Sequence, residues 1–217
     1  MNFLKSTIGR KQLVGLAGLA LAGFVFAHML GNLLILVSPR AYNEYGHALV
    51  SNPLIYIAEA GLVAFFVVHV ILAVVLTLRN RNSREVKYAM AASGDKKTSL
   101  VKKSLWAQGM ILLIFVVLHI ITFKYGEFYS VNYGNGEIRD LHRLVVEVFQ
   151  LPGYVVWYVI SLVLLGYHLS HGVASSFQTL GLSHPKYTPK IKLGSLLFAL
   201  VVSAGFIIQP IYVYLLM

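Results

Sequence analysis

Five long apolar segments dominate this chain and restrict the folds open to it. About 20 consecutive apolar residues cross the hydrocarbon core of a membrane as one helix, and each segment reaches that length. Only 12% of the 217 residues are charged, about half the fraction typical of a soluble domain. The sequence therefore predicts an all-α membrane protein whose five helices form a bundle. We expect a single domain over 1–217, with transmembrane helices at 12–37, 54–78, 104–123, 154–177 and 193–217.

The lysines and arginines predict how these helices are oriented. Fourteen of the 18 lie before the first segment, between the second and third, or between the fourth and fifth. Basic residues collect in cytoplasmic loops, so we expect the N-terminus in the cytoplasm and the C-terminus outside. The same rule explains the net charge of +10 without a nucleic-acid partner. Between the spans we expect a short helix and turn within 79–103 on the cytoplasmic side, and an interfacial helix at 138–149 outside.

Four histidines lie inside four of the apolar segments, and a fifth follows one helical turn after the last of them. They are His28, His69, His119 and His168, with His171 as the fifth. An imidazole in hydrocarbon is costly unless something binds it, and a neutral imidazole is a common axial ligand of haem iron. A lone intramembrane histidine is more often a packing residue or a proton relay. The chain has no cysteine, so it builds no iron–sulfur cluster alone.

Helix direction sorts the histidines by depth. Successive helices alternate in direction, which places His28 and His119 in the outer half of the membrane and His69 and His168 in the inner half. At about 1.5 Å per residue the two levels differ by roughly 10 Å. This arrangement predicts two bis-histidine haems stacked across the membrane, although His171 remains an alternative to His168.

Small and polar residues accompany these histidines. Gly31 and Asn32 share the face of His28, where the glycine serves either the cofactor or helix packing. Gly172 lies one turn beyond His168, where a glycine lets a flat macrocycle approach the backbone, and Ser175 continues that stripe. Candidate partners of haem propionates are, at the inner level, Arg79, Arg81, His171 and Ser175, and at the outer level His47, His142 and Arg143.

Longer motifs surround the histidines. They are 11–32 with its His-x-x-Gly-Asn, Tyr-Asn-Glu-Tyr-Gly-His at 42–47, Thr-Leu-Arg-Asn-Arg at 77–81 after His69, and 168–189, which begins His-Leu-Ser-His-Gly and ends Ser-His-Pro-Lys-Tyr-Thr-Pro. With these motifs nearly the whole chain resembles the single-chain, five-helix diheme cytochrome b subunit of succinate dehydrogenase and fumarate reductase. The resemblance implies that the axial ligands are His28 with His119 and His69 with His168. It also matches Gly172 and Gly181 to family glycines, which favours His168 over His171. Some family members carry a glutamate at the position of Gly166.

The resemblance also implies cofactors, partners and a location. We expect two haem b groups and a membrane quinone, more specifically menaquinone, in the inner membrane of a prokaryote. A flavoprotein and an iron–sulfur subunit are expected on the cytoplasmic face, and dicarboxylate chemistry belongs to them. The expected partners therefore include these subunits, lipid and quinone, and no nucleic acid. Electrons are expected to pass between the iron–sulfur subunit and quinone.

Glu59 is the acidic residue well inside an apolar segment. A buried carboxylate is costly unless it is neutral or paired. Its place in the outer half of the second segment suggests quinone protonation, and a helix-end carboxylate facing the loop is an equal alternative.

Two other functions are also compatible with the sequence. A diheme cytochrome b of a hydrogenase or formate dehydrogenase also predicts haem, with different partners. A transporter or proton channel that uses the histidines as a relay predicts no chromophore.

Overall fold

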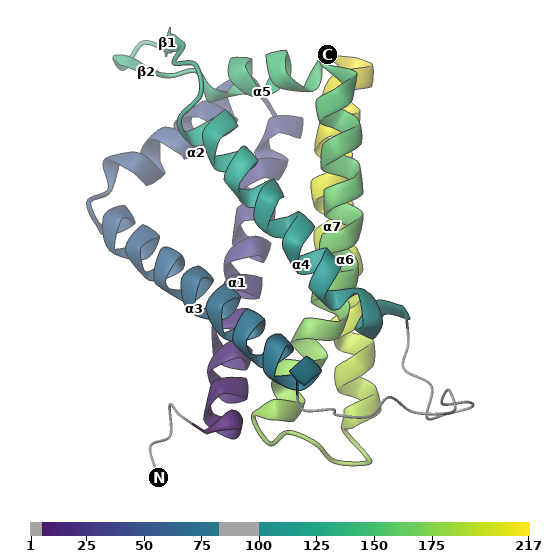
Figure 1. Ribbon diagram of the computed structural model, residues 1–217. Helices are drawn as coiled ribbons and strands as arrows, with labels where there is room; N and C mark the ends of the chain where they lie inside the picture. Colours follow the sequence, from purple (N-terminus) through teal and green to yellow (C-terminus); the bar gives the residue numbers. More distant parts are fainter. Residues whose placement is uncertain (1–5, 83–99) are drawn as a thin grey trace.

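Five long helices run between two ends of the molecule in the computed structural model, which describes residues 6–82 and 100–217. They are α1 (Thr7–Asn32), α3 (Leu54–Asn82), α4 (Leu100–His119), α6 (Pro152–Thr179) and α7 (Thr188–Leu216). All five are long and apolar enough to span a membrane, which confirms the predicted all-α membrane fold. Helix α1 begins at one end of the bundle, which we call the amino end, and α7 ends at the opposite end, which we call the carboxyl end (Figure 1).

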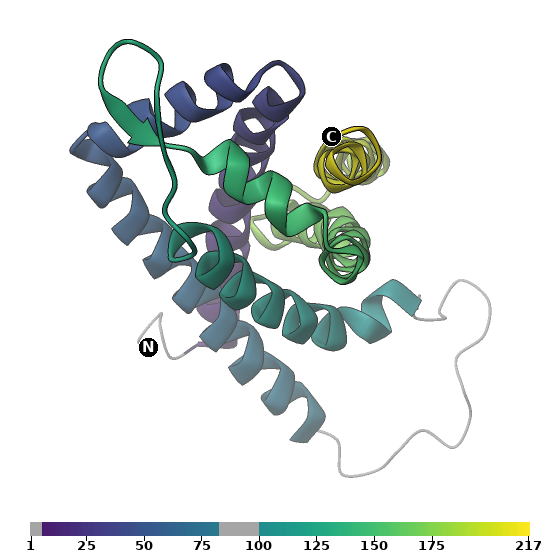
Figure 2. The same ribbon diagram turned by 90° about the horizontal axis from the view of Figure 1, so that it is seen from above.

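Helix α1 occupies the middle of the bundle. It packs against α3, α6 and α7, while α6 packs closely along α7 and α4 crosses α6. Seen from the carboxyl end, α6 and α7 lie nearly end-on and α3 and α4 are tilted (Figure 2). Small residues permit the close contacts, since a Cβ added at Gly15 would lie 3.5 Å from the Ser176 Cα. The contacts of α1 with α3 and α6, and of α4 with α6, give each helix that carries a membrane histidine at least one neighbour that carries another.

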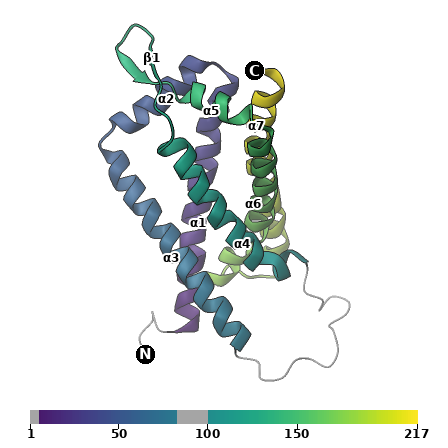
Figure 3. The same cartoon turned by 45° about the horizontal axis from the view of Figure 1, so that its top comes forward.

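Shorter elements cover the carboxyl end. They are the 3₁₀ turn η2 (Leu33–Leu36), α2 (Pro39–Ser51), the π-helical turn η4 (Ile120–Lys124), the antiparallel hairpin β1 (Ser130–Asn132) and β2 (Glu137–Arg139), and α5 (Leu141–Phe149). Figure 3 shows α2, the hairpin and α5 together above the long helices. Asn43 joins them, because its side-chain amide donates to the Tyr133 hydroxyl and Asp140 carboxylate and accepts from the His142 backbone N–H.

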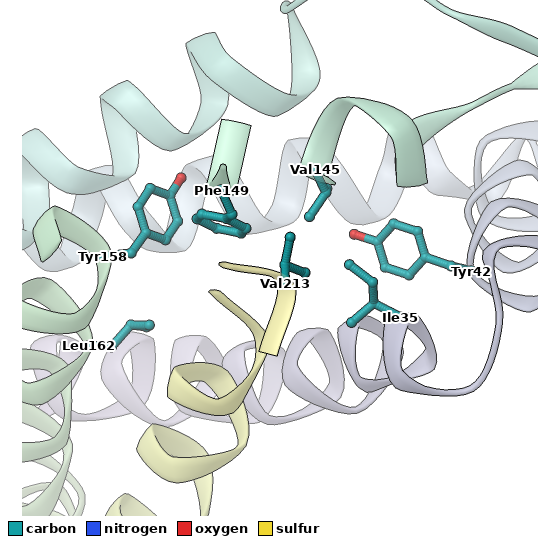
Figure 4. Packing of buried hydrophobic residues seen from close by; sticks show 7 residues of the cluster. All are labelled: Ile35, Tyr42, Val145, Phe149, Tyr158, Leu162 and Val213. Atoms are coloured by element: carbon teal, nitrogen blue, oxygen red, sulfur yellow. The ribbon is translucent and has the colours of Figure 1, made fainter. Parts of the chain in front are cut away.

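The principal core lies directly beneath this cover. It contains Ile35, Tyr42, Val145, Phe149, Tyr158, Leu162 and Val213. In Figure 4, Phe149 lies beside the Tyr158 ring, and Val213 lies between Phe149 and Ile35. Residues from η2, α2, α5, α6 and α7 thus meet in one cluster, which fixes α5 across the carboxyl ends of the bundle.

Several expected boundaries differ from the structure. The first helix begins at Thr7 rather than residue 12, because the Ser6 side chain caps it by accepting from the Gly9 N–H. The interfacial helix begins at Leu141 rather than 138, because Ile138 pairs with Val131 in the hairpin and the Asp140 carboxylate caps α5. His47 belongs to α2, a helix that the apolar segments did not predict. Most of the helix and turn expected within 79–103 lies outside the described residues.

Candidate functional site

The membrane histidines meet in two pairs across the helices. The rings of His28 on α1 and His119 on α4 have centroids 5.8 Å apart. The rings of His69 on α3 and His168 on α6 have centroids 6.2 Å apart. These are the pairs that alternating helix direction grouped in the sequence. We call His28 and His119 the outer pair, and His69 and His168 the inner pair.

The spacing of the rings suits a metal ion between them. An imidazole nitrogen binds a first-row metal ion at about 2 Å, so imidazoles on opposite sides of one ion have ring centroids about 6 Å apart. Both pairs match that separation. The described residues contain no group of three or more His, Cys, Asp or Glu side chains able to hold a metal ion. Two imidazoles with a gap of this size between them are compatible with haem, because the porphyrin ring supplies the other four donors.

Helix α1 shows how far apart the pairs lie. The His69 ring lies against α1 at Gly18, where an added Cβ would be 3.3 Å from Cε1 of the ring. Gly18 precedes His28 by ten residues, which is about 15 Å of helix. The inner pair is accordingly nearer the amino end than the outer pair, by somewhat more than the roughly 10 Å expected from sequence.

Two histidines have a hydrogen-bond partner at Nδ1. The His119 Nδ1 lies 3.1 Å from the Tyr158 hydroxyl oxygen, and the His69 Nδ1 lies 3.3 Å from the Val14 carbonyl oxygen. A neutral imidazole that donates from Nδ1 keeps Nε2 free as a metal ligand. The His168 Nδ1 is buried and has no hydrogen-bond partner among the described residues.

Aromatic side chains surround the outer pair. Phe24 stacks on His28 at a centroid separation of 5.4 Å, and Phe206 lies 5.8 Å from the same ring. Phe115 and Phe123 lie 5.9 and 5.4 Å from His119. These rings keep water from the imidazoles and make the surroundings weakly polar, which strengthens electrostatic effects on any bound group.

The two glycines predicted beside a cofactor differ in their surroundings. A Cβ at Gly31 would lie 2.5 Å from the Tyr45 ring of α2, so this glycine serves helix packing. A Cβ at Gly172 would meet nothing within 4 Å, which leaves room beside α6 one turn from His168. Asn32 bonds within the protein, since its Nδ2 donates to the His28 carbonyl oxygen at 2.8 Å and its Oδ1 accepts from the Tyr42 hydroxyl at 2.9 Å.

The remaining inner-level candidates lie on α3 and α6. His171 and Ser175 are half-buried on α6, and the Ser175 carbonyl accepts from the Thr179 hydroxyl. Arg79 is exposed near the C-terminus of α3, at the amino end of the bundle. The side chain of Arg81 lies outside the part of the chain that is described.

The candidate propionate partners at the outer level differ in whether their polar atoms already form hydrogen bonds or ion pairs within the protein. His47 is exposed and its Nε2 lies 3.2 Å from the Ser51 hydroxyl. Arg143 forms an ion pair with Glu147 at 2.8 Å. Burial lowers the pKa of His142, and Asp140 partly opposes that effect. The buried His142 Nε2 has no hydrogen-bond partner within the described part of the chain. Among the outer-level candidates, His142 therefore has a ring nitrogen still available for a hydrogen bond to another group.

Glu59 is paired rather than isolated. Its carboxylate accepts from the Lys124 Nζ at 2.6 Å, and both side chains are more than one-third exposed. The pair joins the N-terminal part of α3 to η4, at the carboxyl end of the bundle. This geometry favours the helix-end carboxylate over an acid buried in hydrocarbon.

Sequence reasoning missed the residues that hold the histidines in place. Tyr158 is the principal omission, because nothing in the apolar pattern of α6 distinguishes its hydroxyl from that of other tyrosines. A backbone carbonyl such as that of Val14 has no sequence signal. At Gly166 an added Cβ would lie 2.5 Å from the Ser203 Oγ, so α7 fills the space that a glutamate side chain would need.

No protein-family model, curated protein or solved structure matches this chain.

Proposed function

We propose that this chain is the membrane anchor and diheme cytochrome b subunit of a succinate:quinone oxidoreductase, either a succinate dehydrogenase or a fumarate reductase. It would carry electrons between an iron–sulfur partner and membrane quinone. The observation that supports this proposal most is the pairing of four membrane histidines into two sets, at ring separations of 5.8 and 6.2 Å. When bound, two haem b groups supply one-electron carriers at two levels of the membrane.

The chain's own contribution is to bind and orient these groups and to exclude water from them. His28 and His119 would hold the outer haem, and His69 and His168 the inner haem. The Val14 carbonyl and the Tyr158 hydroxyl orient two of the four imidazoles. Gly172 leaves open space beside α6.

The amino end is the proposed docking side for the partner subunits. Arg79, Lys186, Lys190 and Lys192 are exposed there. The excess of basic residues supports a cytoplasmic location for this end, and the resemblance to the cytochrome b family implies a prokaryotic cell. A flavoprotein and an iron–sulfur subunit would bind on this side. Dicarboxylate chemistry would occur in those subunits, and menaquinone would exchange electrons and protons within the membrane.

A reduced-minus-oxidised spectrum of the purified chain tests the haem assignment. We expect cytochrome b bands from two haems in the wild type. His28→Ala and His119→Ala should each remove the same haem, while His69→Ala and His168→Ala should each remove the other. Absence of haem would favour the histidine-relay transporter, and loss of one common haem in His28→Ala and His69→Ala would contradict the pairing.

Affinity purification of the natural complex tests the choice of enzyme. We expect a flavoprotein subunit and an iron–sulfur subunit to copurify, with succinate:quinone reductase or quinol:fumarate reductase activity. Copurification of a hydrogenase or formate dehydrogenase subunit would support the cytochrome b assignment and contradict the assignment to a succinate:quinone oxidoreductase.

A further inference from the structure

The ring of Tyr158 is held firmly beside His119. Tyr158 is 6% exposed, and Phe115 and Phe149 each contact its ring at a centroid separation of 4.9 Å. Figure 4 shows Phe149 directly beside it. With the ring fixed by α4, α5 and α6 together, its hydroxyl oxygen has a defined position 3.1 Å from the His119 Nδ1.

The direction of this hydrogen bond determines which nitrogen of His119 is free. A neutral imidazole carries one N–H. If the Tyr158 hydroxyl donated to Nδ1, the proton of the ring would lie on Nε2, which then offers no lone pair to a metal. If Nδ1–H donates to the hydroxyl oxygen, Nε2 is free, and the acceptor increases the basicity of the ring.

His28, the other member of the outer pair, lacks an equivalent acceptor among the described residues. The polar group nearest its ring nitrogens is the Asn32 Nδ2, at 3.3 Å from Nδ1. That atom is an amide donor, and it makes a shorter bond of 2.8 Å to the His28 carbonyl oxygen. Among the described residues, Tyr158 is therefore the side chain that can accept from a ring N–H of the outer pair.

We propose that Tyr158 is a positioning residue for the outer haem: its hydroxyl oxygen accepts from the His119 Nδ1–H, fixes the ring with Nε2 toward the iron, and lowers the reduction potential at that site. The inference rests on the proposed haem function. The physical reason for the lower potential is that a more basic axial imidazole stabilises ferric over ferrous iron. At the inner pair a backbone carbonyl, that of Val14, has the corresponding place beside His69.

Potentiometric titration of both haems in the purified full-length protein tests this role with Tyr158→Phe. Phenylalanine keeps the packed ring and removes only the hydroxyl. A net hydrogen bond changes an equilibrium by up to about tenfold, so the ferrous-to-ferric ratio of the outer haem at fixed potential should rise by up to that factor. For a one-electron couple a tenfold change is about 59 mV. The electron paramagnetic resonance signal of the ferric outer haem should change with it, and the inner haem should keep its potential.

Tyr214→Phe is the matched control, because Tyr214 lies on α7, which carries none of the four histidines, and is 41% exposed. It should leave both potentials unchanged. The outer haem is identified as the one that His119→Ala removes. Loss of only the outer haem from Tyr158→Phe would also support the inference.

Unchanged potentials in Tyr158→Phe, with both haems bound, would overturn the role of Tyr158 and leave the proposed function intact. Equal shifts of both haems would overturn it as well, since the hydroxyl would then act through the bundle as a whole. Absence of haem from the wild type would instead remove the proposed function.

Discussion

At the scale of single residues, Gly18 decides how closely the His69 ring approaches α1. The ring lies where a side chain at position 18 would begin, with Cε1 and Nδ1 at 3.3 and 3.4 Å from an added Cβ. The same approach brings Nδ1 to the Val14 carbonyl. A missing Cβ and a backbone oxygen thus set the orientation of one proposed ligand.

Gly18→Val should therefore disturb the inner pair alone. The added isopropyl group needs space that the His69 ring occupies, so the ring must move away from both α1 and the Val14 carbonyl. We expect the inner haem to be lost from most of the protein while the outer haem is retained, measured as haem per chain and by redox titration. Gly23→Val is the matched control, because an added Cβ at Gly23 on the same helix meets nothing within 4 Å. Equal haem loss in the two variants would contradict the assignment.

At the scale of elements, the spans were predictable and the parts that orient the side chains were not. Apolar length predicts the five helices because a chain in lipid must satisfy its backbone hydrogen bonds within the segment. Alternating direction then groups His28 with His119 and His69 with His168. The contact of Tyr158 with His119 depends instead on the rotation of α4 and α6 about their axes, and the π-helical turn η4 begins directly after His119.

The cover of the carboxyl end was only partly predicted. Helix α2 was missed, although Ser38 followed by Pro39 is a typical helix start, and the Ser38 side chain does cap it by accepting from the Ala41 N–H. The hairpin was missed because its two strands have three residues each. Such short strands depend on contacts with α2 and α5 rather than on a sequence pattern of their own.

Asn43 joins these elements, so Asn43→Ala should loosen the cover. The side chain is 1% exposed and makes three hydrogen bonds to the hairpin and α5. Alanine leaves the His142 N–H and the Asp140 carboxylate without this partner, which costs about 1–3 kcal/mol for each group that stays buried. We expect faster amide hydrogen exchange in α5 and the hairpin. Glu44→Ala, which removes only an exposed ion pair with Arg40, should leave exchange nearly unchanged, and similar rates in the two variants would argue against the role of Asn43.

At the scale of the whole molecule, α1 connects the two histidine pairs. It carries His28 of the outer pair, and through Val14 and Gly18 it supports His69 of the inner pair. Helix α3 contacts chiefly α1, and the most apolar part of its span has no buried residue. The membrane is therefore needed to cover apolar surfaces that a soluble protein would bury within its own chain.

The orientation of the molecule in the membrane determines which histidine pair is nearer the proposed partner subunits, and this orientation can be measured directly. Because the natural chain has no cysteine, one introduced cysteine is a unique label. Ser183→Cys lies in the exposed connection at the amino end, and Asn135→Cys lies in the exposed turn of the hairpin at the carboxyl end. By the positive-inside rule, a membrane-impermeant maleimide should label Asn135→Cys in intact spheroplasts and should label Ser183→Cys only after permeabilisation. The reverse labelling pattern would place His69 and His168, the inner pair, nearer the outer face of the membrane. It would also exclude docking of a cytoplasmic iron–sulfur subunit at the amino end.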